Sequence, residues 1–168
     1  MTVTAVQKDA QALTMTLTAD FDATPERVWE LWADPRQLER WWGPPTYPAT
    51  FTKHDLTPGS HVVYFMTGPE GDTPHGYWDI LEAEPPRYLA MHDGFANQDG
   101  TPSEEMPGPG RQEVHITPLD GGRTRMEIVS YFPSPEVMEQ LLAMGQEEGM
   151  TKAVGQIDAI LAEEGATR

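Results

Sequence analysis

A long amphipathic segment at the C-terminus constrains the fold of this chain more than any other feature. From Pro135 to Ala162 no proline follows the first residue, and apolar side chains recur at helical spacing. This spacing predicts a long helix with one apolar face. Gly145 and Gly149 fall in its middle and predict either a tolerated loss of helix stability or a kink over a pocket. Because the preceding residues are typical of short strands and turns, the helix must bury its apolar face against their sheet.

One strand and two short helices are predicted near the N-terminus. Residues 13–21 alternate strictly between apolar and polar side chains, which is typical of a half-buried strand. Thr24 is a good N-cap, and Pro25 suits the first position of a helix. A second short helix is expected from Arg36 to Trp42.

Six further strands are predicted between these helices and the C-terminal helix. They are expected at residues 51–56, around 62–66, at 76–83, at 88–95, around 114–116 and at 125–132. Short turns join them in sequence, which favours an antiparallel sheet. The predicted class is therefore α+β, a curved sheet that grips the C-terminal helix. We expect one domain over residues 1–168, with residues 1–10 flexible.

The composition excludes several classes of protein. With 27 acidic and 11 basic side chains, the net charge of −16 disfavours nucleic acid and anionic membrane surfaces as partners. No apolar run approaches the ~20 residues that span a bilayer. Residues 1–11 lack the pattern of a signal peptide, so we expect a cytoplasmic protein without membrane insertion. The chain has no cysteine, and its histidines lack metal-binding spacing, so we expect no metal and no cofactor.

Several short motifs, taken in their order and spacing, resemble one known family. They are Ala23–Trp29 (ATPERVW), Trp41–Pro44 (WWGP), Asp55–Ser60 (DLTPGS), Gly76 with Leu81–Leu89 (LEAEPPRYL), Arg123–Met126 (RTRM) and Glu148–Met150 (EGM). Across Leu13–Glu163 the chain resembles the START-like, helix-grip superfamily (SRPBCC), and within it the family named for the activator of the heat-shock-protein ATPase. The resemblance implies a helix-grip fold, in which a seven-stranded antiparallel sheet curves around a long C-terminal helix. It also implies a cavity between them, used for apolar ligands or, in some branches, for chemistry.

The side chains expected to face that cavity are aromatic, aliphatic and rich in methionine. Alternation along the strands and helical spacing give these candidate ligand-binding residues: Trp41, Trp42, Tyr64, Met66, Trp78, Ile80, Met91, Asp93, Phe95, Met126, Met144 and Met150. Apolar walls with few polar groups suit a small-molecule pocket, and methionine adapts its shape. The alternative is that these side chains only pack a core. Of the adjacent Trp41 and Trp42, one is expected to pack, and the other to line the cavity mouth or to anchor a partner.

These observations support three alternative functions. The first is a binding protein for a small apolar or aromatic molecule, acting as a monomer or a homodimer. The second is an enzyme of the cyclase or dehydratase type, for which Tyr64 and Asp93 are the polar candidates. Neighbours in a strand point to opposite faces, so Asp93 is expected to face the cavity and His92 the solvent, unless Asp93 is solvated at a strand end. The third is a protein-interaction module, a chaperone partner recruited through the acidic surface. The loop at 97–110 suits either a lid or a disordered segment.

Overall fold

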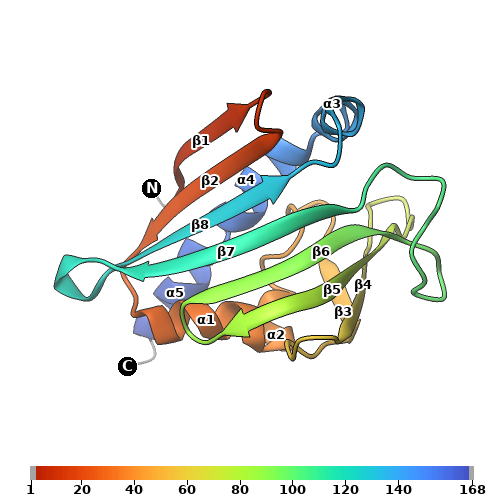
Figure 1. Ribbon diagram of the computed structural model, residues 1–168. Coiled ribbons are helices and arrows are strands. Elements are labelled where there is room, and N and C mark those ends of the chain that lie inside the picture. The colour runs from red at the N-terminus through yellow and green to blue at the C-terminus, as the bar shows by residue number, and fades with distance from the viewer. Residues whose placement is uncertain (1–2, 167–168) are drawn as a thin grey trace.

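An eight-stranded antiparallel sheet forms the body of the computed structural model, which describes residues 3–166, with side chains to Glu163 (Figure 1). The strands are β1 (Val3–Asp9), β2 (Thr14–Phe21), β3 (Ala49–Lys53), β4 (His61–Met66), β5 (His75–Glu84), β6 (Tyr88–Ala96), β7 (Gly110–Pro118) and β8 (Thr124–Tyr131). The helices are α1 (Pro25–Ala33), α2 (Pro35–Leu38), α3 (Pro135–Ala143), α4 (Gln146–Gly155) and α5 (Ile157–Ala166), with a short 3-10 turn η1 (Asp120–Gly122). The order across the sheet is β1-β2-β8-β7-β6-β5-β4-β3.

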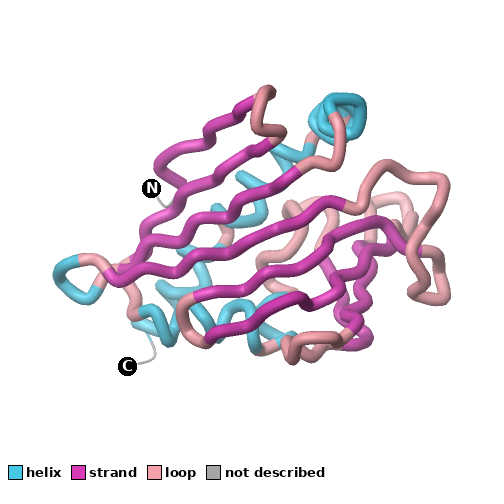
Figure 2. The backbone as a smooth tube through the Cα atoms, viewed as in Figure 1, coloured by secondary structure: helices cyan, strands magenta, loops and turns pink. Residues whose placement is uncertain are grey.

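The helices gather on one face of the sheet, and the strands present their other face to the solvent (Figure 2). The sheet curves so that β3 and β4 turn toward the helices (Figure 1). Alternating side chains explain this arrangement: along β2, Met15, Leu17, Ala19 and Phe21 are buried, and the residues between them are only partly buried. The predicted α+β helix-grip class is therefore confirmed.

The sheet has one strand more than the seven that were expected. Residues 3–9 form β1, an edge strand that pairs antiparallel with β2; residues 1–2 lie outside the described part of the chain. Val3 and Val6 pack against the core, and Lys8 forms an ion pair with Glu147 of α4. These contacts hold β1 against the core and against α4, although its sequence alternates only weakly between apolar and polar residues.

The predicted long C-terminal helix is divided into α3, α4 and α5. The first break lies at Gly145, which adopts a left-handed conformation with φ of 93° and precedes α4. A side chain at this φ would be strained, so glycine permits the break. The second break lies at Gln156, whose side-chain nitrogen donates to the carbonyl oxygens of Gly43 at 2.8 Å and of Trp41 at 3.4 Å. The C-terminal segment is therefore interrupted at two points, and Gly149 lies inside α4 without breaking it.

Two other predicted boundaries also move. The second short helix ends at Leu38 rather than at Trp42, because the chain turns there to bring both tryptophans into the core. The strand expected at residues 51–56 spans Ala49–Lys53 instead. None of the described helices is long and apolar enough to cross a membrane.

Candidate ligand-binding site

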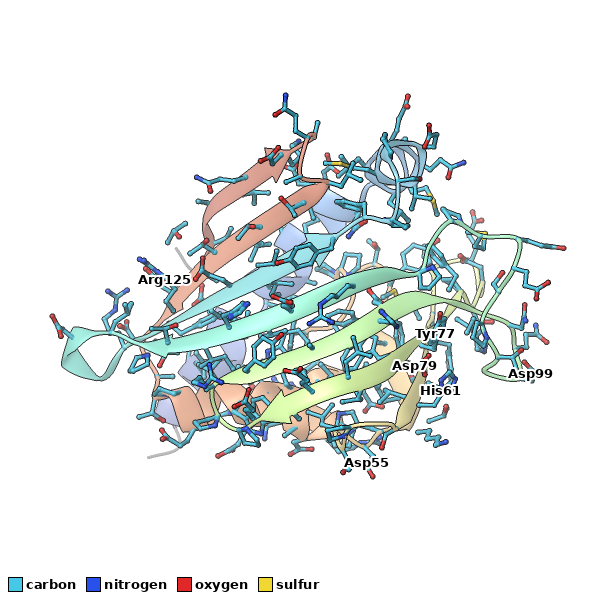
Figure 3. All side chains as sticks on the ribbon, in the orientation of Figure 1. Asp55, His61, Tyr77, Asp79, Asp99 and Arg125 are labelled. Atoms are coloured by element: carbon cyan, nitrogen blue, oxygen red, sulfur yellow. The ribbon has the colours of Figure 1, made fainter. Side chains whose placement is uncertain are left out.

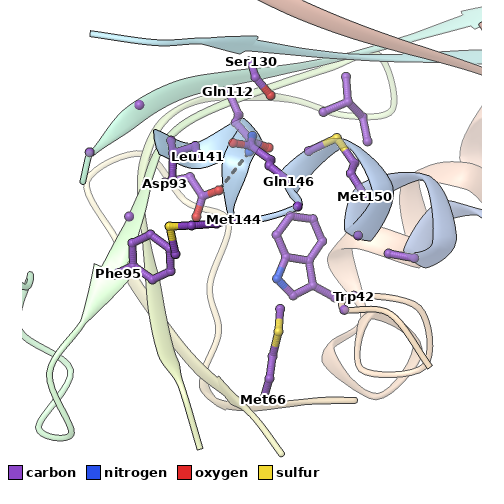
Figure 4. Close-up of a pocket in the computed structure, with 18 of the residues that line it drawn as sticks. Trp42, Met66, Asp93, Phe95, Gln112, Ser130, Leu141, Met144, Gln146 and Met150 are labelled. Atoms are coloured by element: carbon purple, nitrogen blue, oxygen red, sulfur yellow. Dashed lines mark hydrogen bonds between the residues drawn. The ribbon is translucent and has the colours of Figure 1, made fainter. Parts of the chain in front are cut away.

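A pocket of about 370 Å³ lies between the sheet and helices α3 and α4. Strands β6, β7 and β8 form one wall, and the segment after α2 and the end of β4 close the opposite side (Figure 4). The break at Gly145 places the start of α4 across this space, and Gly145 itself is one of the lining residues. Pro107, Gly108 and Gly110 bring the end of the 97–110 loop into the wall, so that part of the loop belongs to the pocket.

The wall is mainly apolar, and side chains from α3, from α4 and from the segment between them face those of the sheet. The apolar lining residues include Met66, Phe95, Ile128, Phe132, Leu141, Met144, Met150 and Val154. Met144 is 54% exposed and Tyr131 is 37% exposed, and both line the pocket. Large exposed apolar side chains beside a pocket mark its rim as a surface that an apolar molecule can reach.

The candidate residues divide into two groups. The structure brings these to the pocket wall: Trp41, Trp42, Tyr64, Met66, Asp93, Phe95, Met144 and Met150. It places Trp78, Ile80, Met91 and Met126 in the hydrophobic core instead, each no more than 2% exposed. The rings of Trp32, Trp42 and Phe51 surround Trp78 at centroid distances of 6.0, 4.9 and 5.4 Å. Aromatic packing therefore fills that part of the concave face, where an open cavity was expected.

The two adjacent tryptophans differ in how their indole nitrogens are satisfied. Trp41 is 1% exposed, and its Nε1 donates to the Leu31 carbonyl oxygen at 2.9 Å. Trp42 is 8% exposed and lines the pocket, and its Nε1 makes no hydrogen bond of good geometry, although it lies near enough to the Tyr64 hydroxyl to oppose the rise in the pKa of Tyr64. Trp41 is thus anchored in the core, while Trp42 offers an unused donor in the pocket wall.

A polar group interrupts the apolar wall where β6, β7 and β8 lie side by side. The Nε2 of Gln112 donates to Oδ2 of Asp93 at 2.8 Å, and Gln112 stands opposite Ser130 in the β7–β8 register. Gln112 and Ser130 are 4% and 3% exposed. Figure 4 shows Asp93, Gln112 and Gln146 grouped at one end of the pocket, with Ser130 beside Gln112.

Several polar atoms in this part of the pocket have no partner within the protein. Oε1 of Gln112, Oγ of Ser130 and Oε1 of Gln146 are buried without a hydrogen bond, as is Nε1 of Trp42. Buried polar atoms are normally paired, so four unpaired atoms in one pocket are unusual. Sequence reasoning missed Gln112, Ser130 and Gln146. The first two were detectable, because they share the inward alternation of Val114 on β7 and Ile128 on β8.

The Asp93 carboxyl has an unusual acidity. Its burial raises its pKa from 3.8 to about 7, although the nearby Tyr64 hydroxyl opposes the shift. Burial, together with the charge of Asp93, also raises the pKa of Tyr64 well above its usual value. A Cβ at Gly76 would lie 2.4 Å from the Tyr64 hydroxyl oxygen, so glycine makes room for this tyrosine. Near neutral pH, Asp93 can therefore hold or release a proton, as a general acid or base must.

The described residues contain no group of three or more His, Asp or Glu side chains arranged to hold a metal ion. Arg111 is the one basic side chain among the described residues that line the pocket. Its Nε donates to Glu113 at 2.9 Å, and its Nη2 donates to the Tyr88 hydroxyl at 3.3 Å. The polar end of the pocket therefore combines the Asp93 carboxyl group and the amides of Gln112 and Gln146 with the hydroxyl groups of Tyr64 and Ser130 and the indole nitrogen of Trp42.

With this geometry established, comparison with known proteins identifies the family. The model of the family described as Activator of Hsp90 ATPase homolog 1-like protein matches residues 22–162. The chain belongs to this family. The resemblance found in the sequence is thereby confirmed, and the family match includes every residue that lines the pocket.

Solved structures of other proteins support the same fold for this Activator of Hsp90 ATPase homolog 1-like chain. A protein from Arthrobacter aurescens, solved by NMR, is 49% identical, with a TM-score of 0.91 over 96% of this chain and 93% of that chain. Protein Ms6760 from Mycobacterium smegmatis is 45% identical, with a TM-score of 0.86 over 95% of this chain and 96% of that chain. DynU16, from the dynemicin biosynthetic locus, is 17% identical, with a TM-score of 0.63 over 89% of this chain and 47% of that chain; this likeness concerns the fold alone. No curated protein matches the chain.

Proposed function

We propose that the chain is a binding protein for a small apolar or aromatic molecule, held in the pocket between the sheet and helices α3 and α4. The observation that carries this proposal is the set of buried, unpaired polar atoms in an otherwise apolar pocket. A buried polar atom without a partner costs about 1–3 kcal/mol. A ligand with complementary groups removes that cost, whereas a core built only for stability would place apolar side chains there.

The size and wall of the pocket agree with this proposal. Its volume of about 370 Å³ falls within the roughly 300–1,000 Å³ of small-molecule sites. Met66, Met144 and Met150 line it together, and methionine adapts its shape to irregular partners. These features support a site that holds an apolar body and orients it by a few polar contacts.

Binding of a neutral aromatic probe, N-phenyl-1-naphthylamine, tests the proposal. Gly149 lines the pocket, and a Cβ there would meet no atom within 4 Å, so Gly149→Phe fills the pocket without a backbone clash. Gly155 lies on the same helix, has equal room and does not line the pocket, so Gly155→Phe is the matched control. We expect the probe to bind the unaltered protein and Gly155→Phe equally, and Gly149→Phe at least about tenfold more weakly. Equal binding to all three proteins, or no binding to any, would contradict the proposal.

One observation favours a second candidate, an enzyme that uses the same pocket. Asp93, with a pKa of about 7, lies near the Tyr64 hydroxyl, and such a pair can exchange a proton with a bound ketone. Deuterium incorporation beside the carbonyl of phenylacetone in D₂O measures this chemistry. We expect exchange above the buffer rate with the unaltered protein and none with Asp93→Asn. Equal exchange rates for the two proteins would show that Asp93 does not catalyse the exchange, and the enzyme hypothesis would be wrong.

A further inference from the structure

We propose that the polar end of the pocket recognises a protonated primary or secondary amine carried on an apolar body. This inference rests on the proposed binding function and names the chemistry of its ligand. It follows from the kind of polar atoms that the pocket leaves unpaired, from their charge and from the aromatic rings beside them.

Three of the four unpaired atoms in the pocket can accept a hydrogen bond, and the fourth, Nε1 of Trp42, is a donor. Oε1 of Gln112 and Oε1 of Gln146 can only accept, and Oγ of Ser130 can accept or donate. Because Nε2 of Gln112 already donates to Asp93, the amide orientation is fixed and its oxygen is left for another partner. An ammonium group supplies two or three donors from one atom, which matches several acceptors converging on one place.

The charge at this end of the pocket also favours a cation. No basic side chain among the described residues acts on the pKa of Asp93, and Arg111, which also lines the pocket, is engaged by Glu113 and Tyr88. A bound ammonium would provide the missing counter-charge through a charge-assisted hydrogen bond. The net charge of −16 adds a field that attracts cations and repels anions. A carboxylate ligand is therefore the least suited of the common head groups.

Aromatic rings complete the site. Trp42, Tyr64 and Phe95 line the same pocket, and the rings of Trp42 and Tyr64 are 6.0 Å apart between centroids. Figure 4 shows Trp42 and Phe95 on either side of the space beside Asp93. Aromatic faces attract an organic cation and also pack against its apolar body. The combination of one carboxylate, several acceptors and aromatic walls fits an amine better than an alcohol or an acid.

Three probes of similar size and different head groups test the inference. The affinities of 2-phenylethylamine, 2-phenylethanol and 3-phenylpropanoate are measured at pH 8 by isothermal titration calorimetry. We expect the amine to bind at least about tenfold more tightly than the alcohol, and the carboxylate more weakly than both. Asp93→Asn should weaken amine binding at least about tenfold and change alcohol binding less than about threefold.

Two further variants test the inference independently of Asp93→Asn. Gln146 is only partly buried and lies at the start of α4, so Gln146→Leu should fold and should weaken amine binding several-fold by removing one acceptor. Asp79 lies on the other face of the sheet, paired with His61, so Asp79→Asn should leave all three affinities unchanged.

The possible results distinguish a failure of the amine inference from a failure of the proposed binding function. If the alcohol or the carboxylate binds as tightly as the amine, and Gly149→Phe abolishes that binding, the amine inference is wrong and the pocket remains a binding site. Amine binding that survives Asp93→Asn unchanged also overturns the inference. If no probe binds, the amine inference is wrong, and the naphthylamine experiment decides separately whether the pocket binds apolar molecules at all.

Discussion

Two polar clusters on opposite faces of the same sheet differ in how completely their groups are paired. On the solvent face, Nδ1 of His61 lies 2.6 Å from Oδ1 of Asp79, and its Nε2 lies 2.7 Å from the Gly100 carbonyl oxygen. The His61 ring also stacks on Tyr77 at a centroid distance of 5.2 Å (Figure 3). On the helix face, Asp93 and Gln112 bond to each other, but the nearby polar atoms remain unpaired.

The difference separates a structural cluster from a binding site. Both ring nitrogens of His61 face acceptors, so all hydrogen bonds of this cluster are made when the ring is protonated. The bond to the Gly100 carbonyl links the turn at Gly100 to the sheet. The pocket cluster is more deeply buried, yet its groups are less satisfied. Burial without pairing costs stability, and a ligand that supplies the missing partners explains why the cost is tolerated.

Replacing Asp93 should produce the largest change in stability, and it tests whether the polar cluster in the pocket is less well paired than the one on the solvent face. The folded-state pKa of Asp93 is about 7 against 3.8 for an unperturbed group, so the folded protein binds the proton more tightly than the unfolded chain. Stability therefore falls as pH rises from about 4 to about 7. Asp93→Asn removes this penalty and should stabilise the protein by about 2–4 kcal/mol at pH 8.

Urea unfolding of the protein and of Asp93→Asn at pH 4 and pH 8 checks this expectation. The gain should be confined to the higher pH, because the unaltered carboxyl is protonated in the folded state at pH 4. A variant that is equally stable or less stable at pH 8 would show that the buried carboxylate is well satisfied, and the contrast between the faces would fail.

The two adjacent tryptophans provide a smaller, matched comparison. Trp41→Phe leaves the buried Leu31 carbonyl without its partner, whereas Trp42→Phe removes a donor that has none. Both changes delete similar ring volume, so their difference reports the hydrogen bond. We expect Trp41→Phe to be less stable than Trp42→Phe by about 1–2 kcal/mol in urea unfolding. Equal stabilities would indicate that the Trp42 nitrogen is paired in solution.

His61→Ala should give the smallest effect and should depend on pH in the opposite direction from Asp93→Asn. Burial alone lowers the pKa of His61, but hydrogen bonds to Asp79 and to the Gly100 carbonyl outweigh it, so the pKa rises above 6.5. The stabilisation is complete below pH 6.5 and is lost as pH rises through the folded-state value. We expect His61→Ala to lose about 1 kcal/mol at pH 6 and less at pH 9.

Hydrogen exchange at residues 97–102 should also quicken in His61→Ala, because the bond to Gly100 is lost. His92→Ala, which changes an exposed side chain on the same sheet face, should match the unaltered protein in both measurements. If His61→Ala loses the same stability at pH 6 and at pH 9, the protonated form of His61 does not stabilise the fold through Asp79 and the Gly100 carbonyl.

Local patterns were enough to predict much of the fold and part of the site. Strict alternation located β2, and the opposite directions of neighbouring strand residues placed Asp93 in the pocket wall and His92 in solvent. The same rule applied to β7 and β8 would have found Gln112 and Ser130 as polar side chains at inward positions. On β7 and β8 only apolar residues were assigned to the inward face, so Gln112 and Ser130 were missed.

The remaining differences depend on tertiary contacts that no local pattern contains. Whether Trp78 lines a cavity or packs in a core is decided by Trp32 and Phe51, which reach it from distant segments. The position of Gln146 depends on the left-handed turn at Gly145, where the spacing of the segment allowed a continuous helix. β1 is held by packing and by an ion pair to α4 rather than by its own alternation.

A carbon-13 NMR titration of the Asp93 carboxyl, with and without 2-phenylethylamine, tests the central claim most directly. We expect the free protein to show a pKa of about 7, and saturating amine to lower that pKa by at least about one unit, because the ammonium stabilises the charged form. A free-protein pKa near 3.8, or one that the amine leaves unchanged, would contradict a ligand-binding pocket organised around an uncompensated Asp93.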